Sequence, residues 1–274
     1  MLLANLLTNG LGPAAYLLVV GLGPLIFFTW IIHQLERLMQ RRLSMSFGWN
    51  SVLITGWLGT PIHELSHAIM CVIFRHDIVE MELFKPDRKN GRLGYVTHSY
   101  QRGNLYQELG TFFIGMAPLL GGSLVLFLLL LIFFPDVART AFVTIEAENG
   151  SLPLWQQVGN SLQQLFAGLF QIENLLSIRL WLFVYLVTCV GSHMAPSMSD
   201  YEGGFKGGAL LLIGLGIASV LVVVISPQTA TVASLVRPVL VPTLTGLIAV
   251  IALCVTSTLV VFAITELIGK RLRG

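Results

Sequence analysis

The residues best suited to chemistry in this chain are the histidines and the glutamate of HELSH, residues 63–67. His63 and His67 stand at positions i and i+4, so on a helix both imidazoles lie on one face, one turn apart. Two imidazoles in this arrangement can bind a single zinc ion, Zn2+, which lowers the pKa of its bound water to roughly 7. Glu64 lies beside them and, as a general base, can pass a proton from that water to the leaving amine. The motif therefore predicts a zinc-dependent hydrolase.

The segment that carries the motif is apolar, with the sequence GWLGTPIHELSHAIMCVIF. A carboxylate at depth in a membrane-spanning helix costs about 3 kcal/mol, so Glu64 there needs a functional reason. Two other interpretations stay open. An HExxH pattern can occur by chance on a solvated helix, and buried His and Glu also line ion or proton pathways. We favour the protease, because Glu64 is the only acidic residue deep in an apolar run.

A third zinc ligand must come from elsewhere, because catalytic zinc usually has three protein ligands and one open position. The best source is the segment CVGSHMAPSMSDYEGG, which offers His193, Asp200 and Glu202. Pro196 breaks a helix there, and residues 196–206 are expected to form a short polar turn back toward the other helices. Asp200 is the first choice for the third ligand and His193 the second.

The composition indicates that membrane-spanning helices position these residues. The chain of 274 residues is 55% hydrophobic and 11% charged, whereas soluble domains are about a quarter charged. A spanning helix needs about 20 mostly apolar residues. Six segments qualify, at about 14–32, 51–74, 109–134, 175–195, 207–225 and 241–268. We expect one all-α polytopic integral membrane domain over residues 1–274, with about six transmembrane helices. The net charge of +2 suggests no nucleic-acid partner.

Two connections between the apolar segments have patterns of their own. Residues 77–101 contain apolar residues alternating with acidic ones, then the strong turn signal Asn90-Gly91, so we expect a small membrane-associated β-hairpin. Residues 153–171 contain no charged residue and carry apolar residues at helical spacing. They predict a helix in the membrane interface plane, with a plain packing helix as the alternative.

These features together resemble the site-2 protease family of intramembrane zinc metalloproteases. The resemblance lies in HELSH, the hairpin after it, the element GMAPLLGG around Pro118, and the Pro196-then-Asp200 segment. It covers residues 51–204, which would form the catalytic core, and it implies that Asp200 is the third zinc ligand. Members of the family commonly have an asparagine, proposed to steady the oxyanion, three residues before the proline. His193 occupies that position here, and the spacing from Pro196 to Asp200 is one residue shorter than usual.

His193 is accordingly expected to face the site and to donate a hydrogen bond to the developing oxyanion. The alternative is a histidine at a helix end, packed near the interface. Glu64 and His193 are thus the predicted catalytic residues, and His63, His67 and Asp200 the predicted metal ligands.

The predicted function is an intramembrane zinc endopeptidase that cuts membrane-spanning or membrane-associated proteins. Its expected partners are a membrane protein substrate, the lipid bilayer and a regulatory membrane partner. The protein would be a multi-pass integral membrane protein, in the cell membrane if the organism is bacterial. The stretch between the third and fourth predicted spans, about 40 residues, is too short for a PDZ domain. The alternative function is a non-hydrolytic membrane protein, either a metal transporter or a pseudoprotease scaffold; a transporter would show polar residues through several spans.

The hairpin is also predicted to hold the substrate. A transmembrane helix hides its peptide carbonyls in its own hydrogen bonds, so a substrate must unwind locally before it can be cut. An exposed strand edge can pair with the freed backbone groups whatever the substrate sequence. We expect residues 79–100 to present such an edge beside the zinc-bearing helix, with a simple solvated loop as the alternative.

Overall fold

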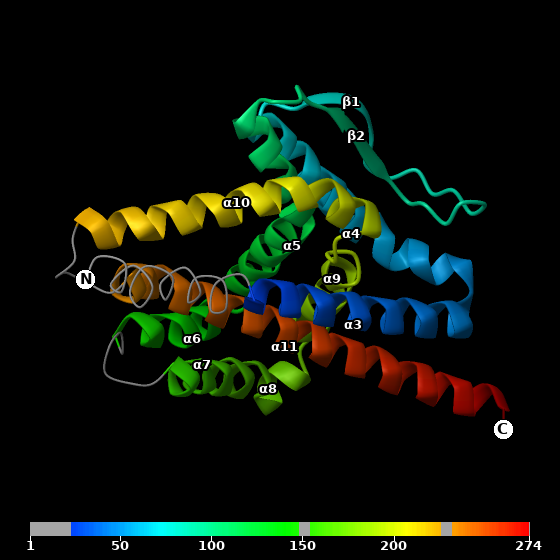
Figure 1. The fold of residues 1–274 in the computed structure, drawn as a ribbon. Helices are drawn as coiled ribbons and strands as arrows, with labels where there is room; N and C mark the ends of the chain where they lie inside the picture. Colours follow the sequence, from blue (N-terminus) through cyan, green and yellow to red (C-terminus); the bar gives the residue numbers. More distant parts are fainter. Residues whose placement is uncertain (1–22, 148–153, 226–231, 274) are drawn as a thin grey trace.

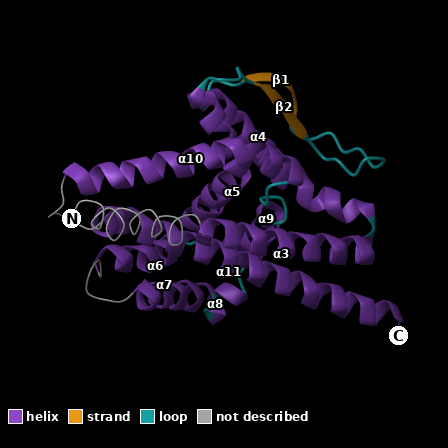
Figure 2. Ribbon diagram, in the orientation of Figure 1, coloured by secondary structure: helices purple, strands orange, loops and turns teal. Residues whose placement is uncertain are grey.

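The computed structural model describes residues 23–147, 154–225 and 232–273. In this part of the chain the protein is mostly helical, with one small antiparallel sheet of two strands (Figures 1 and 2). The helices are α3 (Gly23–Phe47), α4 (Trp49–Ile73), α5 (Leu105–Phe133), α6 (Pro135–Ala147), α7 (Leu154–Leu169), α8 (Ile172–Leu175), α9 (Ile178–Gly191), α10 (Met198–Ile225) and α11 (Val232–Arg273). The strands are β1 (Asp77–Glu82) and β2 (Tyr95–Ser99).

Helix α5 lies at the centre of the arrangement, since α4, α9 and α10 all pack against it. It begins where the side chain of Asn104 accepts hydrogen bonds from the backbone N–H groups of Tyr106 and Gln107, which is a stabilising N-cap. α3 and α11 pack together, as do α6 and α7 (Figure 1). Because α4 carries HELSH and α10 begins near Asp200, α5 sets the position of both parts of the predicted site.

Glycines let α5 and α10 approach each other closely. A Cβ atom on Gly115 would lie 2.5 Å from the carbonyl oxygen of Asp200, and one on Gly207 would lie 2.6 Å from the backbone nitrogen of Phe112. A Cβ atom less than 3.0 Å from a backbone atom forces something to shift, so no larger residue fits at either position without movement. The first turns of α10 are therefore fixed against the backbone of α5.

Within the described residues, two helices are long and apolar enough to cross a membrane: Leu105–Phe133 of α5 and Thr245–Leu267 within α11. These correspond to the third and sixth predicted spans. The first predicted span, 14–32, lies partly outside the described residues. The second and fifth fall in α4 and α10, which are helical but are not among these two.

The fourth predicted span, 175–195, does not form one helix. The hydroxyl of Ser177 accepts a hydrogen bond from the backbone N–H of Leu180, so a new helix begins there, and it ends at Gly191. Helix α9 is an apolar helix of 14 residues, and at 1.5 Å per residue it is shorter than the hydrocarbon core is thick.

The predicted β-hairpin is confirmed as an antiparallel pair. Asp77 lies opposite Ser99 and Glu82 opposite Tyr95, with an irregularity between Ile78 and Glu80. Gly91 has a φ of +67°, as the predicted turn requires. The hairpin lies over one end of α4 and α5 (Figures 1 and 2).

Two other local predictions meet different outcomes. The helix predicted at 153–171 is present as α7, but Leu165 and Leu169 are buried in the main apolar core, so that face packs inside the protein. The polar turn predicted at 196–206 is wrong, because Met198 to Ile225 form one helix with Asp200 in its first turn. Its start is fixed by a reciprocal pair of hydrogen bonds between Ser197 and Asp200.

Candidate metal centre

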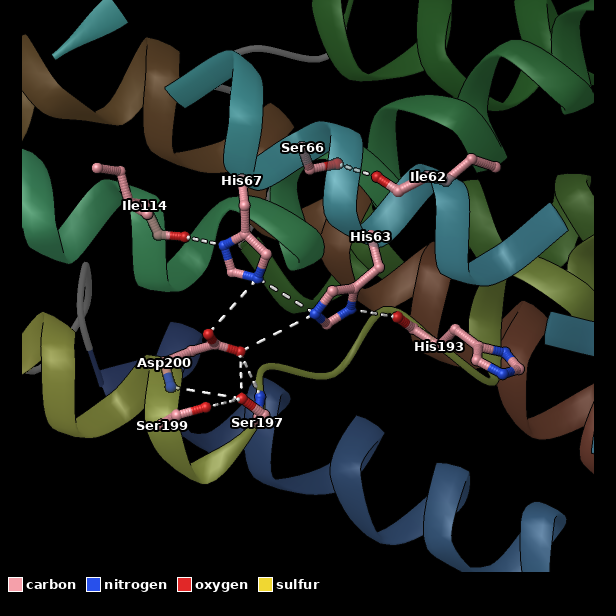
Figure 3. A network of polar contacts seen from close by, with 9 residues as sticks. All are labelled: Ile62, His63, Ser66, His67, Ile114, His193, Ser197, Ser199 and Asp200. Carbon is pink, nitrogen blue, oxygen red and sulfur yellow. Dashed lines mark hydrogen bonds and ion pairs between the residues drawn. The ribbon is translucent and has the colours of Figure 1, made fainter. Parts of the chain in front are cut away.

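Three side chains from two helices meet at one point (Figure 3). His63 and His67 come from α4 and Asp200 from α10, and one potential ligand atom of each lies within 4.8 Å of the others. Nε2 of His67 is 3.5 Å from Oδ1 of Asp200, Nε2 of His63 is 3.9 Å from Oδ2, and the two Nε2 atoms are 3.2 Å apart. Ligands about 2 Å from one tetrahedral zinc ion are roughly 3.3 Å apart. The spacing therefore suits a shared metal ion.

Each histidine directs Nε2 to this point because a backbone carbonyl holds its other ring nitrogen. Nδ1 of His63 lies 2.6 Å from the carbonyl oxygen of His193, and Nδ1 of His67 lies 2.8 Å from that of Ile114. A carbonyl can only accept, so in the neutral imidazoles both hydrogens are at Nδ1 and both Nε2 lone pairs are free. Outer partners of this kind fix the orientation of metal-binding histidines.

Asp200 is held by the start of α10. The backbone N–H of Ser197 donates to Oδ2 at 2.7 Å and the Ser197 hydroxyl donates to the same oxygen at 2.6 Å. In return the backbone N–H of Asp200 donates to the Ser197 hydroxyl at 3.4 Å. This capping box places the carboxylate at the positive end of the helix, where a negative charge is stabilised. Oδ1 is left to face His67.

Glu64 lies in the same cavity without belonging to the group of ligand atoms. The cavity has a volume of about 430 Å³ and is lined by His63, Glu64, His67 and Asp200 on one side. Residues 94–98, which include β2 as far as His98, line it as well. The Glu64 side chain is buried. A carboxylate beside a metal site, but not in the ligand group, has the placement that a general base requires.

The ring of His193 does not face the group (Figure 3). Its Nδ1 lies 2.9 Å from the hydroxyl of Ser192 and 3.2 Å from the carbonyl oxygen of Cys189. A Cβ atom on Gly59 of α4 would lie 2.8 Å from that nitrogen, so the ring packs against α4. What His193 offers to the site is its backbone carbonyl, which accepts from His63. His193, the predicted oxyanion donor, therefore contacts the site through its backbone carbonyl and not through its imidazole.

The loop that carries this carbonyl is tied to α3. The side-chain amide of Gln40 donates to the carbonyl oxygen of Ser192 at 3.0 Å and to Glu36 at 2.9 Å. Pro196 follows at the end of the loop, and the three residues Glu36, Gln40 and Pro196 line a second cavity of about 350 Å³ on the other side of His63 and Glu64. The amide of Gln40 therefore supports the orientation of a predicted ligand from a helix outside the 51–204 core.

Several groups that hold the predicted metal ligands in place were not predicted from the sequence. Ser197 could have been found, because Ser197-x-x-Asp200 fits the pattern of a capping box. The carbonyls of Ile114 and His193 carry no sequence signal, since every residue has one. Glu202 remained a candidate ligand, but the described residues that gather at this point are His63, His67 and Asp200.

Comparison with known proteins adds no relative. No protein-family model matches the chain, and neither a curated protein nor a solved structure matches it. The geometry of the centre is therefore what supports a function.

Proposed function

We propose that this chain is an intramembrane zinc endopeptidase of the site-2 protease type. The observation that carries the proposal is the convergence of His63, His67 and Asp200 within 4.8 Å, in a cavity that also holds Glu64. Two imidazoles and one carboxylate are a donor set of hydrolytic zinc sites, which keep a further position open for water or substrate. The hydrogens fixed at both Nδ1 atoms leave this donor set ready for a cation.

Each residue then has a distinct role. Zinc held by the three ligands would supply a Lewis acid that activates water and polarises a peptide carbonyl. Glu64 accepts a proton from the attacking water and gives it to the nitrogen of the leaving amine. Arg92, from the hairpin tip, lines the same cavity and adds a positive charge near Glu64. Strand β2 lines one side of this cavity and so limits the access of other water there.

Strand β2 is proposed to hold the substrate. Residues 94–98 are consecutive, yet all of them line the cavity. Successive side chains of a strand point to opposite faces, so an unbroken run indicates that the edge of β2 borders the cavity. In the described sheet, β2 pairs with β1 along one edge only. The other edge of β2 is therefore available to a peptide. Within the edge expected along residues 79–100, the substrate is thus assigned to β2.

A location in the bilayer is supported by the surface of α4. Its outward face carries large apolar side chains that are 46% to 69% exposed: Ile54, Trp57, Leu65, Ile69 and Val72. An apolar patch of this kind is unfavourable in water and suits lipid. With α5 and α11 as the candidate spans, we propose that α4, α9 and α10 complete a multi-pass core, to which the predicted first span would add a sixth.

One comparison in cells tests the proposal. Membrane proteomes of cells with the wild-type chain and with Glu64→Ala are compared. We expect at least one membrane protein to accumulate as a precursor in the variant and to appear as a shortened product only in the wild type. Purified wild-type protein should hold one zinc per chain. A purified, folded chain that takes up no zinc when it is supplied would overturn the proposal.

A further inference from the structure

A second pair of histidines lies beside the metal centre. His76 lies three residues beyond the end of α4 and is 5% exposed, whereas His98 belongs to β2 and lines the 430 Å³ cavity. Their Nδ1 atoms are 3.0 Å apart. The ring of Tyr100 stacks on His76, with the centroids 4.9 Å apart. The predicted ligand set and the predicted base use neither histidine.

The position of the hydrogens in this pair follows from one carbonyl. Nε2 of His76 lies 2.8 Å from the carbonyl oxygen of Gln107, which can only accept, so that nitrogen carries a hydrogen. In neutral His76 the other nitrogen, Nδ1, then has a lone pair. The hydrogen shared between the two Nδ1 atoms therefore belongs to His98. Nε2 of His98 is left with a lone pair, and His76 fills the space at its Nδ1.

The frame around His76 is held firmly. The side-chain amide of Gln107 donates to the carbonyl oxygen of Arg75 at 2.6 Å, and its oxygen accepts from the backbone N–H of Gln101 at 2.7 Å. Arg75 has a φ of +59°, a left-handed conformation that few residues other than glycine adopt. Strained backbone of this kind persists where the surroundings fix it, and it gathers at functional sites. Gln107 thus holds His76 through its carbonyl and holds the preceding residue, Arg75, through its side chain.

We propose that His98 binds the substrate by accepting a hydrogen bond at Nε2 from a peptide N–H, and that His76 is the positioning residue that fixes its tautomer. The proposal names a binding contact for the peptide substrate and rests on the proposed protease function. His98 stands on β2, the strand assigned to the substrate, and its Nδ1 is occupied by a histidine outside the cavity lining. The ring edge with Nε2 is what remains to face a ligand. A strand edge can leave one peptide N–H of the bound chain unpaired, and a fixed acceptor satisfies it.

The neutral state of His98 agrees with its surroundings. Burial, and then the neighbouring His76, lower the pKa of the His98 imidazole below its ordinary value. The ionisable groups that face it are His76 and, across the cavity, His67 and Asp200. A lone pair at Nε2 is therefore the state present at neutral pH.

The tautomer can be measured without any proteolysis. Zinc-loaded full-length protein, labelled with ¹⁵N at histidine and held in lipid, is studied by NMR, and the His98 signals are assigned by their loss in His98→Asn. We expect a protonated Nδ1 and an unprotonated Nε2 for His98 in the wild type. In His76→Phe, which removes the acceptor and keeps a ring, the hydrogen should move largely to Nε2. A protonated Nε2 in the wild type, or no change in His76→Phe, would overturn the proposal.

Binding tests the contact itself. The probes are a trileucine hydroxamate, which can chelate the metal and extend along β2, and analogues with one backbone N–H methylated at a time. We expect one analogue to bind the wild type up to about tenfold more weakly, the loss typical of one hydrogen bond. His98→Asn keeps a polar group near Nδ1 but none at Nε2, and it should show no such penalty. His98→Gln places an oxygen near the Nε2 position and should restore part of the methylation penalty.

The outcomes separate the two proposals. If the wild type binds the hydroxamate and the methylation penalty is the same in His98→Asn, then His98 is not the acceptor, although the metal centre stands. If zinc-loaded wild type does not bind the hydroxamate at all, the protease function itself fails, while the NMR result still decides the state of His98. Circular dichroism of all three variants ensures that only folded protein is compared.

Discussion

The two histidine pairs of this protein differ in how many backbone carbonyls hold them. His63 and His67 each have a carbonyl at Nδ1, so each keeps its own hydrogen and the two Nε2 lone pairs face one another at 3.2 Å. In the second pair only His76 contacts a backbone carbonyl, that of Gln107, so one hydrogen lies between the two rings and Nε2 of His98 keeps a lone pair. The two converging lone pairs of His63 and His67 suit a cation. The single lone pair on Nε2 of His98 suits a hydrogen-bond donor. The backbone carbonyls beside each pair therefore determine whether a histidine faces a metal or a peptide.

The largest effect on the first pair is expected when the carboxylate that lies with His63 and His67 is removed. Asp200→Ala should lower zinc affinity more than about 100-fold, beyond the effect of losing an outer partner, as measured by chelator competition and metal analysis. Glu202→Ala is the matched control and should retain one zinc per chain. His76→Phe should retain it too, because the second pair binds no metal. Loss of zinc from Glu202→Ala with zinc kept in Asp200→Ala would contradict the assignment.

Removing the base should leave both pairs intact. Glu64→Gln preserves the shape of the side chain but takes up no proton, so proteolysis should fall about 100- to 10,000-fold. Its zinc content should equal that of the wild type, because Glu64 is outside the ligand group. The two quantities are measured on the same preparation. Turnover near the wild-type rate would remove Glu64 from its role.

The link between the metal centre and α5 can be tested at a glycine. Gly115→Ala would place a methyl group 2.5 Å from the carbonyl oxygen of Asp200, so α10 must move and zinc affinity should fall about 10- to 100-fold. Gly214→Ala, in α10, is the control, since a Cβ there meets nothing within 4 Å. Equal zinc affinity in the two variants would show that α10 does not need this close approach.

The assignment of the substrate to β2 is sharpened by proline. Proline placed singly along residues 95–99 removes one backbone donor at a time. At positions whose N–H faces the cavity, cleavage should fall up to about tenfold while zinc content is unchanged. Single prolines along β1 that preserve the fold should leave cleavage unchanged. Uniform tolerance across both strands would refute the idea that a strand edge holds the substrate.

The smallest effect is expected at His193. Because its contribution is a backbone carbonyl, His193→Asn should change zinc affinity by less than about tenfold. The variant also carries the residue common in the site-2 protease family, which this sequence resembles. Complete loss of zinc from it would place the imidazole among the ligands, against the orientation of its ring.

The parts that sequence could predict are those set by local pattern. The spacing of His63 and His67 dictates a shared helix face, and Asn90-Gly91 dictates a turn. Asp200 was found because zinc chemistry requires a third ligand and the chain offers few. These inferences need only the side chains and the periodicity of the elements.

The parts that sequence could not predict depend on contacts between distant segments. The carbonyls of Ile114 and Gln107 reach α4 and His76 only after α5 has packed, and no residue type marks them. The pairing of His76 with His98 arises from the register of the hairpin. The start of α10 was not predicted, because Pro196 predicted the beginning of a turn. The capping pattern Ser197-x-x-Asp200, which follows it, indicates a helix instead. Hydropathy alone predicted the fourth span as one segment, 175–195, and overlooked the break at Ser177.

The reciprocal hydrogen bonds of Ser197 and Asp200 also restrict how this segment can vary in length. Each residue advances an α-helix by about 100°. An insertion or deletion of one residue between Ser197 and Asp200 would break the cap and rotate the carboxylate away from His67 at the same time. Relatives with the same centre should therefore tolerate substitutions at Met198 and Ser199 far more readily than any change in their number.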